Sequence, residues 1–245
     1  MQGQRLHIFE TVEALHAQAA TRIRECADEA VADHGSFHMA LAGGQTPVGV
    51  YRALQGAEGF PWERAHLYLG DERTVPLDHA DSNYRMARES LVDHVPVPAD
   101  HVHPMGTTAP PEKAAAAYAE LLARRLPRDA ADRPRFDLVL LGMGPDGHVA
   151  SLFPDTDILR RRQRLVAAVY VEKLETWRLS LTLPAINAAR HVFLLVAGAG
   201  KADVIRHVFR AGPEAAPLPV QRVHPEGGPE WFVDAAAARY LSGAS

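Results

Sequence analysis

Short apolar runs alternate with segments of helical period along most of the chain. The clearest helical segment is 11–33, in which Leu15 and Ala19 belong to an apolar series spaced by three or four residues. Thr11 is placed to cap its start and Gly35 to end it. Further helices are predicted at 48–54, 83–92, 112–126, 201–210 and 234–241. Strands are predicted at 36–42, 64–69, 102–105, 137–141, 164–171, 177–183, 191–196 and 231–233.

This alternation predicts an α/β fold with a mostly parallel, doubly wound, Rossmann-like sheet and helices on both of its faces. The piece 170–183 breaks the alternation, and we expect it to form a small antiparallel excursion. The chain contains no internal repeat and no low-complexity linker. A single domain over residues 1–245 is the simplest account.

The charge balance changes the list of expected partners. The net charge is −4, so no basic surface indicates nucleic acid or an anionic membrane as a partner. Cys26 is the only cysteine, which excludes an internal disulfide and a cysteine-based metal cluster. No apolar run approaches the ~20 residues that span a bilayer. We expect a cytoplasmic protein, either a monomer or a small homo-oligomer.

The segment 136–154, FDLVLLGMGPDGHVASLFP, is the most informative part of the chain. It begins as an apolar run typical of a strand buried on both faces. The run then breaks into Gly142, Gly144 and Gly147, so the backbone must turn sharply. His148 follows directly, and after it we expect a short helix. Open α/β sheets bind ligands at this end of a strand. A surface histidine after a tight turn is the alternative.

Two further loops carry residues suited to anion binding. Gly43, Gly44 and Thr46 lie between a predicted strand and a helix, where backbone N–H groups and the helix dipole suit phosphate. A plain strand-to-helix turn is the alternative reading. The loop lacks both the Gly-Lys-Ser/Thr ending of a P-loop and the third glycine of the dinucleotide fingerprint.

The charged candidates follow other predicted strands. Arg73 is able to hold an oxyanion by two parallel hydrogen bonds. Asp71 and Glu72 beside it are either acid–base groups or residues that orient the loop, and the structural role is favoured. Arg178 stands at the head of an alternating strand. Lys201 lies at a predicted helix start, where a cation opposes the helix dipole unless an anion binds.

Metal, cofactor and serine-hydrolase chemistry lack their usual patterns. His101 and His103 share one face of a strand, but no third ligand lies at a spacing typical of a metal site, and no HExxH helix is present. No Gly-x-Ser-x-Gly elbow occurs either. We therefore expect neither a metal nor a cofactor.

Several motifs together resemble the 6-phosphogluconolactonases, which share a superfamily with the glucosamine-6-phosphate deaminases. The resemblance covers nearly the whole chain in the same order, and its most specific part is the segment that contains Asp-Gly-His. The motifs are LAGGQTP at 41–47, LGDERTVP at 69–76, Ser82-Asn83-Tyr84, GMGPDGHVASLFP at 142–154, WRLSLTLPAINAA at 177–189 and GAGK at 198–201.

The resemblance implies hydrolysis of 6-phospho-D-glucono-1,5-lactone to 6-phosphogluconate in the oxidative pentose phosphate route. His148 is then the general base that activates water, since a histidine titrates near neutral pH. Asp146 either orients His148 or only shapes the loop, and the Gly147 amide is a candidate oxyanion donor. The resemblance implies a substrate-binding set of Gly43, Gly44, Thr46, Asp71, Arg73, Gly147, Arg178 and Lys201.

Two other functions stay open at this point. A deaminase resembles this chain in its Gly-Gly loop and in Asp-Gly-His, but it carries a tyrosine where Arg73 stands and a Phe-Asn-Glu-Pro ending where this chain has Leu152-Phe153-Pro154. A non-catalytic sugar-phosphate sensor is the other alternative. One departure touches the lactonase reading, because Leu174-Glu175-Thr176-Trp177 replaces a link that is often rich in proline. The path of the loop between Lys173 and Arg178 is therefore open.

Overall fold

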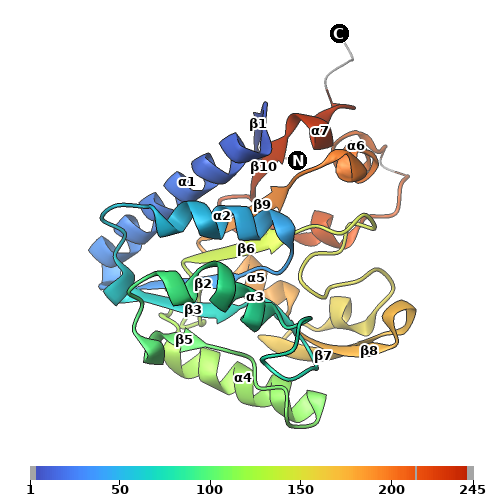
Figure 1. Ribbon diagram of the computed structural model, residues 1–245. Helices are drawn as coiled ribbons and strands as arrows, with labels where there is room; N and C mark the ends of the chain where they lie inside the picture. The colour runs from blue at the N-terminus through green and yellow to red at the C-terminus, as the bar shows by residue number, and fades with distance from the viewer. Residues whose placement is uncertain (1–3, 213, 242–245) are drawn as a thin grey trace.

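The computed structural model describes residues 4–212 and 214–241 (Figure 1). Its main sheet has seven parallel strands within these residues, in the order β1-β10-β9-β6-β2-β3-β5. The strands are β1 (Arg5–Phe9), β2 (Phe37–Leu41), β3 (Ala65–Leu69), β5 (Val102–His103), β6 (Leu138–Gly142), β9 (His191–Val196) and β10 (Glu230–Asp234). The predicted α/β class with a mostly parallel sheet is confirmed.

Helices alternate with the strands along most of the chain, as the hydrophobic period of the sequence predicts. Thr11 caps the longest of them, since its Oγ1 accepts a hydrogen bond from the Ala14 N–H at 3.1 Å, and Gly35 ends it with a positive φ of 85°. The α-helices are α1 (Val12–His34), α2 (Gln45–Gln55), α3 (Asn83–Ser90), α4 (Pro111–Arg125), α5 (Leu183–Asn187), α6 (Ala202–Arg210) and α7 (Ala235–Ala238). Short 3₁₀ helices are η1 (Trp62–Arg64), η2 (Val92–His94), η3 (Ala99–His101), η4 (Asp157–Arg160), η5 (Glu172–Leu174), η6 (Ala199–Lys201) and η7 (Pro219–Arg222).

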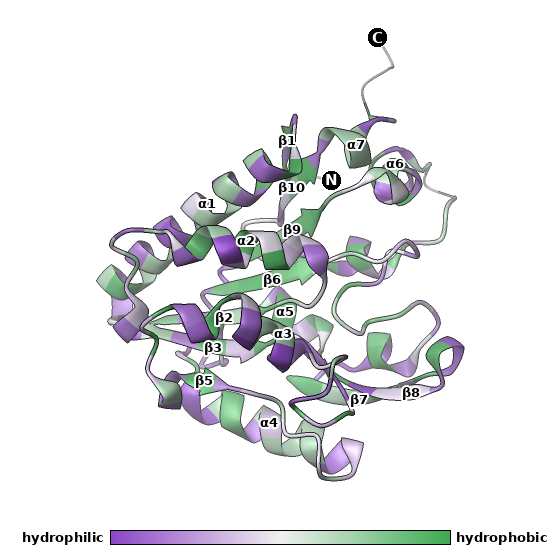
Figure 2. Cartoon of the chain, in the orientation of Figure 1, coloured by the Kyte–Doolittle hydropathy of each residue, from purple (hydrophilic) through white to green (hydrophobic). Residues whose placement is uncertain are grey.

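Both faces of the main sheet are buried. Along β6, Leu138 and Leu140 pack into a core formed with α1, α2 and α3, whereas Val139 and Leu141 pack into a second core formed with α4, α5, α6 and α7. Neighbouring residues of one strand point to opposite faces, so a strand in the middle layer must be apolar throughout. Figure 2 shows β6 in the hydrophobic colour along its length.

A small antiparallel sheet flanks the main sheet and contains β4 (Asp71–Arg73), β8 (Thr176–Leu181) and β7 (Val166–Val171). The expected antiparallel excursion at 170–183 is thereby confirmed. The β7–β8 hairpin turns through η5 and through Glu175, whose φ is 47°. The loop between Lys173 and Arg178, which the sequence leaves open, is the tip of this hairpin and the first part of β8.

The order of the strands creates a crevice between β2 and β6. From β2 the chain continues to β3 and β5 on one side, and then it returns to β6 on the other side of β2. The loops after β2 and β6 therefore leave the sheet in opposite directions, which is the topological switch point where open α/β sheets bind ligands. The loops that begin at Ala42 and Met143 are these two loops.

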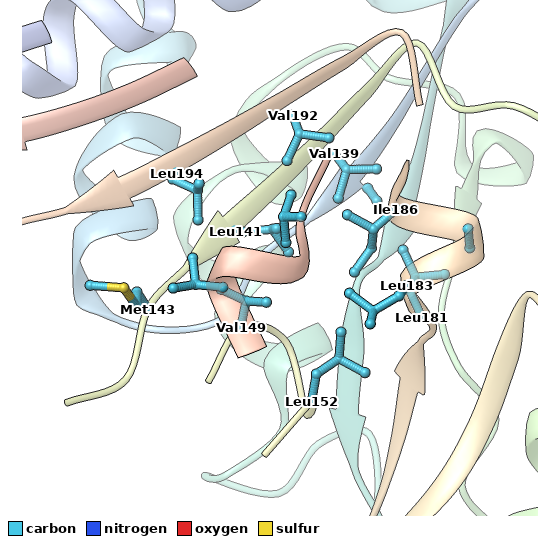
Figure 3. Close-up of a cluster of buried hydrophobic side chains, with 14 of the residues drawn as sticks. Val139, Leu141, Met143, Val149, Leu152, Leu181, Leu183, Ile186, Val192 and Leu194 are labelled. Atoms are coloured by element: carbon cyan, nitrogen blue, oxygen red, sulfur yellow. The ribbon is translucent and has the colours of Figure 1, made fainter. Parts of the chain in front are cut away.

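Several elements differ from the sequence prediction. The strands β1 and β4 and the short helix α5 were not predicted. The edge strand β1 lacks the pattern of a buried strand, because four of its five residues are exposed. Helix α2 begins at Gln45 rather than at residue 48. The segment directly after His148 is not an α-helix, because Val149 and Leu152 form a β-bridge. Both side chains are fully buried and belong to the cluster that Figure 3 shows.

Four histidines stack beside one another across β2, β3, η3 and β5, namely His38, His66, His101 and His103. The ring centroid of His66 lies 4.6 Å from that of His38 and 3.8 Å from that of His101. Burial and the neighbouring histidines lower the pKa of His38 to about 3. The same two causes lower the pKa of His66 and of His103 to about 4. The rings of His38, His66 and His103 are therefore uncharged at neutral pH.

This stack predicts a loss of stability in mild acid. Because the folded-state pKa of His38 lies below the usual 6.5, the unfolded chain binds more protons, and stability falls as pH drops below about 6.5. Between pH 7.5 and pH 5 the wild type should lose about 1–2 kcal/mol more unfolding free energy than His38→Gln, whose amide does not titrate. Urea denaturation at the two pH values measures this difference. His224→Gln, at an exposed position, is the control. Equal pH dependence in wild type and His38→Gln would contradict the assignment.

Candidate active site

A cavity of about 560 Å³ opens at the carboxyl ends of β2, β3, β6 and β9. Most of the site residues expected from the sequence line it, although they come from five separate segments of the chain. Two expected residues, Asp146 and Gly147, are not among the lining residues. Those that line the cavity are Gly43, Gly44, Thr46, Asp71, Arg73, His148, Arg178 and Lys201.

His148 and Asp146 form a hydrogen-bonded pair. The distance from His148 Nδ1 to Asp146 Oδ1 is 2.5 Å. Burial opposes ionisation of Asp146, but hydrogen bonds from Lys173 and His148 prevail and lower its pKa to about 2. An ionised carboxylate accepts the proton of Nδ1, which leaves the lone pair of the neutral ring on Nε2. The pair therefore has the arrangement of a general base and its orienting group.

Burial controls the protonation of His148. Its side chain is 25% exposed, and this burial lowers the pKa of the imidazole, while the bond to Asp146 offsets part of the effect. The ring also packs against Phe153, with 4.1 Å between ring centroids. The imidazole is thus held neutral and in place, which suits a base that works near neutral pH.

The loop that carries the pair is anchored in the core, and at Gly144 it has no side chain facing the His148 ring. Met143, Val149 and Leu152 are buried on either side of His148 (Figure 3). Gly144 donates its N–H to the carbonyl oxygen of His148 at 2.9 Å. A Cβ on Gly144 would lie 2.1 Å from the Nδ1 of His148, so only glycine leaves room for the ring.

The role expected for Gly147 needs correction. Its N–H already donates to the carbonyl oxygen of Gly144 at 3.0 Å, and its carbonyl oxygen accepts from Val220 at 3.0 Å. Its φ is 75°, and a Cβ there would meet Leu218 at 2.7 Å. Gly147 therefore shapes the turn, and its amide is not free to stabilise an oxyanion.

Asp71 is held by two neighbours that sequence reasoning did not place in the site. Its Oδ1 accepts from Asn83 Nδ2 at 3.1 Å, and its Oδ2 accepts from Ser151 Oγ at 2.7 Å. Asn83 also lies so close to Gly43 that a Cβ on this glycine would be 2.3 Å from its Oδ1. Asn83 stands in the Ser82-Asn83-Tyr84 motif, which was the available signal. This network fixes the Asp71 carboxylate at the cavity wall.

Glu72 has the structural role that the sequence favours. Its side chain is fully buried, and its carboxylate accepts from the backbone N–H groups of Asn83 and Tyr84, each at 2.8 Å. It also accepts from Ser82 Oγ at 3.0 Å. Burial raises the pKa of Glu72 and these bonds oppose the rise. The carboxylate therefore satisfies the amino end of α3, which complements the helix dipole.

Arg73 and Arg178 lie directly opposite each other in the β4–β8 pair. Like charges in this register destabilise a sheet. Burial and then the charge of Arg73 lower the pKa of Arg178. The Nε atoms of both arginines are buried without a hydrogen-bond partner within residues 4–212 and 214–241. Paired guanidinium groups with free donors at a cavity wall are suited to bind an anion.

Two further features add positive potential to the cavity. Helix α2 begins directly after Gly44, whose φ is 100°, and no side chain caps this end. The first N–H groups of α2 are therefore free to meet a ligand. Lys201 is the last residue of η6 rather than the first of an α-helix, and burial lowers its pKa. Lys201 still lies at the amino end of α6, as expected.

Lys173 is a lining residue that sequence reasoning left out of the site. It forms an ion pair with Asp146, and its Nζ lies 4.6 Å from the centroid of the Phe153 ring. The available signal was that the chain has few lysines, since Lys173 is one of three.

The described residues also bear on metal binding and on membranes. Within these residues, no group of three or more His, Cys, Asp or Glu side chains is placed to hold a metal ion. No helix in the described part of the chain is long and apolar enough to cross a membrane.

The fold and the cavity define an α/β protein of the doubly wound class with a histidine–aspartate pair at the same cavity as two opposed arginines. Residues 10–231 match the sequence model of a family described as glucosamine-6-phosphate isomerases/6-phosphogluconolactonase. The chain belongs to this family.

Individual relatives agree with this assignment. A 6-phosphogluconolactonase of Synechocystis is 43% identical over 87% of this chain and 88% of its own length. One of Mycobacterium tuberculosis is 37% identical over 96% of this chain and 98% of its own. The solved structure of 6-phosphogluconolactonase from Trypanosoma brucei has a TM-score of 0.87 at 30% identity, covering 98% of this chain and 99% of that one. A monomeric glucosamine-6-phosphate deaminase, with a TM-score of 0.79 at 20% identity over 96% of this chain and 99% of that one, shares the fold.

The lack of a side chain at Gly144 leaves room for the His148 ring, and a substitution there tests the position of the ring. Gly144→Ala should lower kcat by about 10²-fold or more, because the added methyl displaces the His148 ring from its working position. Steady-state kinetics together with a thermal unfolding curve measure activity and folding separately. Gly106→Ala is the matched control, since a Cβ there meets nothing within 4 Å. Near-native activity of Gly144→Ala would show that the ring is not held in this position during catalysis.

Proposed function

We propose that this protein hydrolyses 6-phospho-D-glucono-1,5-lactone to 6-phospho-D-gluconate, a step of the oxidative pentose phosphate pathway. The observation that carries the proposal is a neutral histidine bonded to an ionised aspartate, beside a cavity that also holds two opposed arginines with free Nε donors. The relatives at 36–43% identity that bear the name 6-phosphogluconolactonase support it.

His148 is the proposed general base. Its Nε2 takes a proton from a water molecule while that water attacks the C1 carbonyl carbon of the lactone. The tetrahedral intermediate then collapses, the bond from C1 to the ring oxygen breaks, and the imidazolium returns the proton to that oxygen. Asp146 keeps the ring in the required tautomer and stabilises the imidazolium that forms between the two steps. No covalent intermediate is needed.

The positive groups of the cavity bind the phosphate and orient the lactone. Arg73 and Arg178 offer guanidinium donors from the small sheet, Lys201 offers an ammonium group from beyond β9, and the amino end of α2 offers backbone N–H groups. The phosphate lies far from the reacting carbon, so these contacts act by positioning the substrate. Asp71, fixed by Asn83 and Ser151, is a hydrogen-bond acceptor for a sugar hydroxyl.

The remaining expectations stay predictions. A deaminase is disfavoured by Arg73 and by Leu152-Phe153-Pro154, and a non-catalytic sensor by the intact His148–Asp146 pair. A cytoplasmic location is also a prediction, and it differs among relatives, since one at 36% identity is named chloroplastic. A single domain over residues 1–245, a monomeric or small homo-oligomeric state and the lack of a nucleic-acid partner are expected on the same terms.

The central test is replacement of the base. The wild type should hydrolyse the phosphorylated lactone faster than the spontaneous reaction, and His148→Ala should lower kcat by ~10²–10⁴, the usual share of a general base. Hydrolysis is measured by proton release, with spontaneous opening subtracted. Ammonia release from glucosamine 6-phosphate is measured in parallel. Ammonia without lactone turnover would replace the proposal by the deaminase, and near-native turnover by His148→Ala would remove His148 from its role.

Arg178 and Lys201 should act mainly through the phosphate. Loss of one charge-assisted contact to phosphate typically costs about 1.5–3 kcal/mol, or roughly 10–100-fold in kcat/KM. For Arg178→Ala and Lys201→Ala the loss should shrink greatly on glucono-1,5-lactone, which has no phosphate to bind. Kinetics of both variants on both substrates give this comparison, with Lys113→Ala on exposed α4 surface as control. Equal losses on the two substrates would mean that these cations serve the reacting carbonyl or the fold.

A further inference from the structure

Lys173 lies at the tip of the β7–β8 hairpin and reaches across to the loop after β6. It belongs to η5, and its ammonium group pairs with Oδ2 of Asp146, while Oδ1 of the same carboxylate bonds to Nδ1 of His148. The two oxygens of one carboxylate therefore join an ammonium group to an imidazole.

A second contact fixes the ammonium group from another side. Lys173 Nζ lies 4.6 Å from the centroid of the Phe153 ring, and the Phe153 ring lies 4.1 Å from the His148 ring. Attraction between a cation and an aromatic face adds to the ion pair. The four side chains form one closed cluster, although the Lys173 side chain is 52% exposed.

We propose that Lys173 is a positioning residue: it holds the Asp146 carboxylate against Nδ1 of His148, which keeps the lone pair on Nε2, and its charge opposes protonation of the imidazole. This inference rests on the proposed hydrolytic function for its kinetic consequences. The geometry behind it depends only on the contacts among Lys173, Asp146, Phe153 and His148.

The charges around His148 support this role. Asp146 and, more distantly, Asp71 from β4 favour the imidazolium form, whereas burial and the charge of Lys173 disfavour it, so burial lowers the pKa of His148 with help from Lys173. Lys201 faces the cluster from η6, and its charge interacts with Asp146. Removing the Lys173 charge leaves the carboxylates less opposed, and the pKa of His148 should then rise.

A direct contact between Lys173 and the substrate is the competing explanation, because Lys173 lines the cavity. The two roles differ in what they change. A substrate contact acts on KM and does not depend on Asp146, whereas a positioning role acts on kcat and on the pH profile through Asp146.

The kinetic experiment compares Lys173→Met, Lys173→Arg and the control Lys113→Met with wild type between pH 5 and pH 9. Lys173→Met should lower kcat by roughly 3–10-fold with KM within about 2-fold, which is the scale of a partly exposed ion pair. The acid limb of kcat/KM should move up by roughly half a pH unit, since the base becomes easier to protonate. Lys173→Arg should restore both, and Lys113→Met should change neither.

A double-mutant cycle with Asp146→Asn separates the two roles. If Lys173 acts through Asp146, adding Lys173→Met to Asp146→Asn should cost little further activity. A raised KM with an unmoved acid limb would overturn the proposal in favour of a substrate contact. The same would follow if Lys173→Met lowered the activity of Asp146→Asn by the same factor as that of the wild type.

The titration of His148 gives a readout that needs no turnover. The imidazole resonance, assigned as the one absent from His148→Gln, should titrate at higher pH in Lys173→Met than in wild type. An unchanged titration in an enzyme that hydrolyses the lactone would overturn the role of Lys173 and leave the proposed function standing. A shifted titration in a protein that does not hydrolyse the lactone would overturn the function and leave the charge coupling standing.

Discussion

Burial of β6 on both faces and along both edges is the constraint on which the site depends. The strand pairs with β2 on one edge and β9 on the other, and it contributes Leu140 to one core and Leu141 to the other. No polar side chain has room within such a strand, so reactive groups must follow its last residue. The chain then returns at once to the core through Val149 and Leu152 (Figure 3), which leaves His148 little freedom. Apolar packing is therefore what positions His148.

The two opposed arginines are placed by strand register rather than by apolar packing. The small sheet places Arg73 opposite Arg178, an arrangement that repulsion opposes, with buried Nε donors that have no partner in the described residues. A bound phosphate would satisfy these donors and remove the repulsion. Repulsion between the two guanidinium groups that a bound anion relieves would increase the free energy gained on binding. The packing of the core that supports both sheets offsets the cost of this repulsion to the free energy of folding.

Much of the fold and most of the site were predictable, because both leave local signals. Helix α1 shows its period, its cap and its terminal glycine, and β9 spans the residues expected. The loops after strands stand out because their glycines interrupt apolar runs. The edge strand β1 was missed because its exposed residues lack the pattern of a buried strand.

The contacts that the sequence does not predict depend on pairing between distant segments of the chain. The opposition of Arg73 and Arg178 depends on the register of β4 and β8, and the contact of Lys173 with Asp146 depends on where the hairpin tip ends. The error at Gly147 has a similar cause, since the direction of a single N–H depends on backbone angles that composition does not reveal. Residue types thus predict which groups a site contains, and strand register decides which of them meet.

The β7–β8 hairpin connects the two halves of the site. Arg178 lies on its second strand beside Arg73, and Lys173 lies at its tip against Asp146. Anything that displaces the hairpin therefore acts on the arginine pair and on the histidine–aspartate pair together. The residues between them, Leu174 to Trp177, contain no proline, and Glu175 takes the positive φ that reverses the chain. Such a tight turn keeps Lys173 and Arg178 on one short, hydrogen-bonded unit.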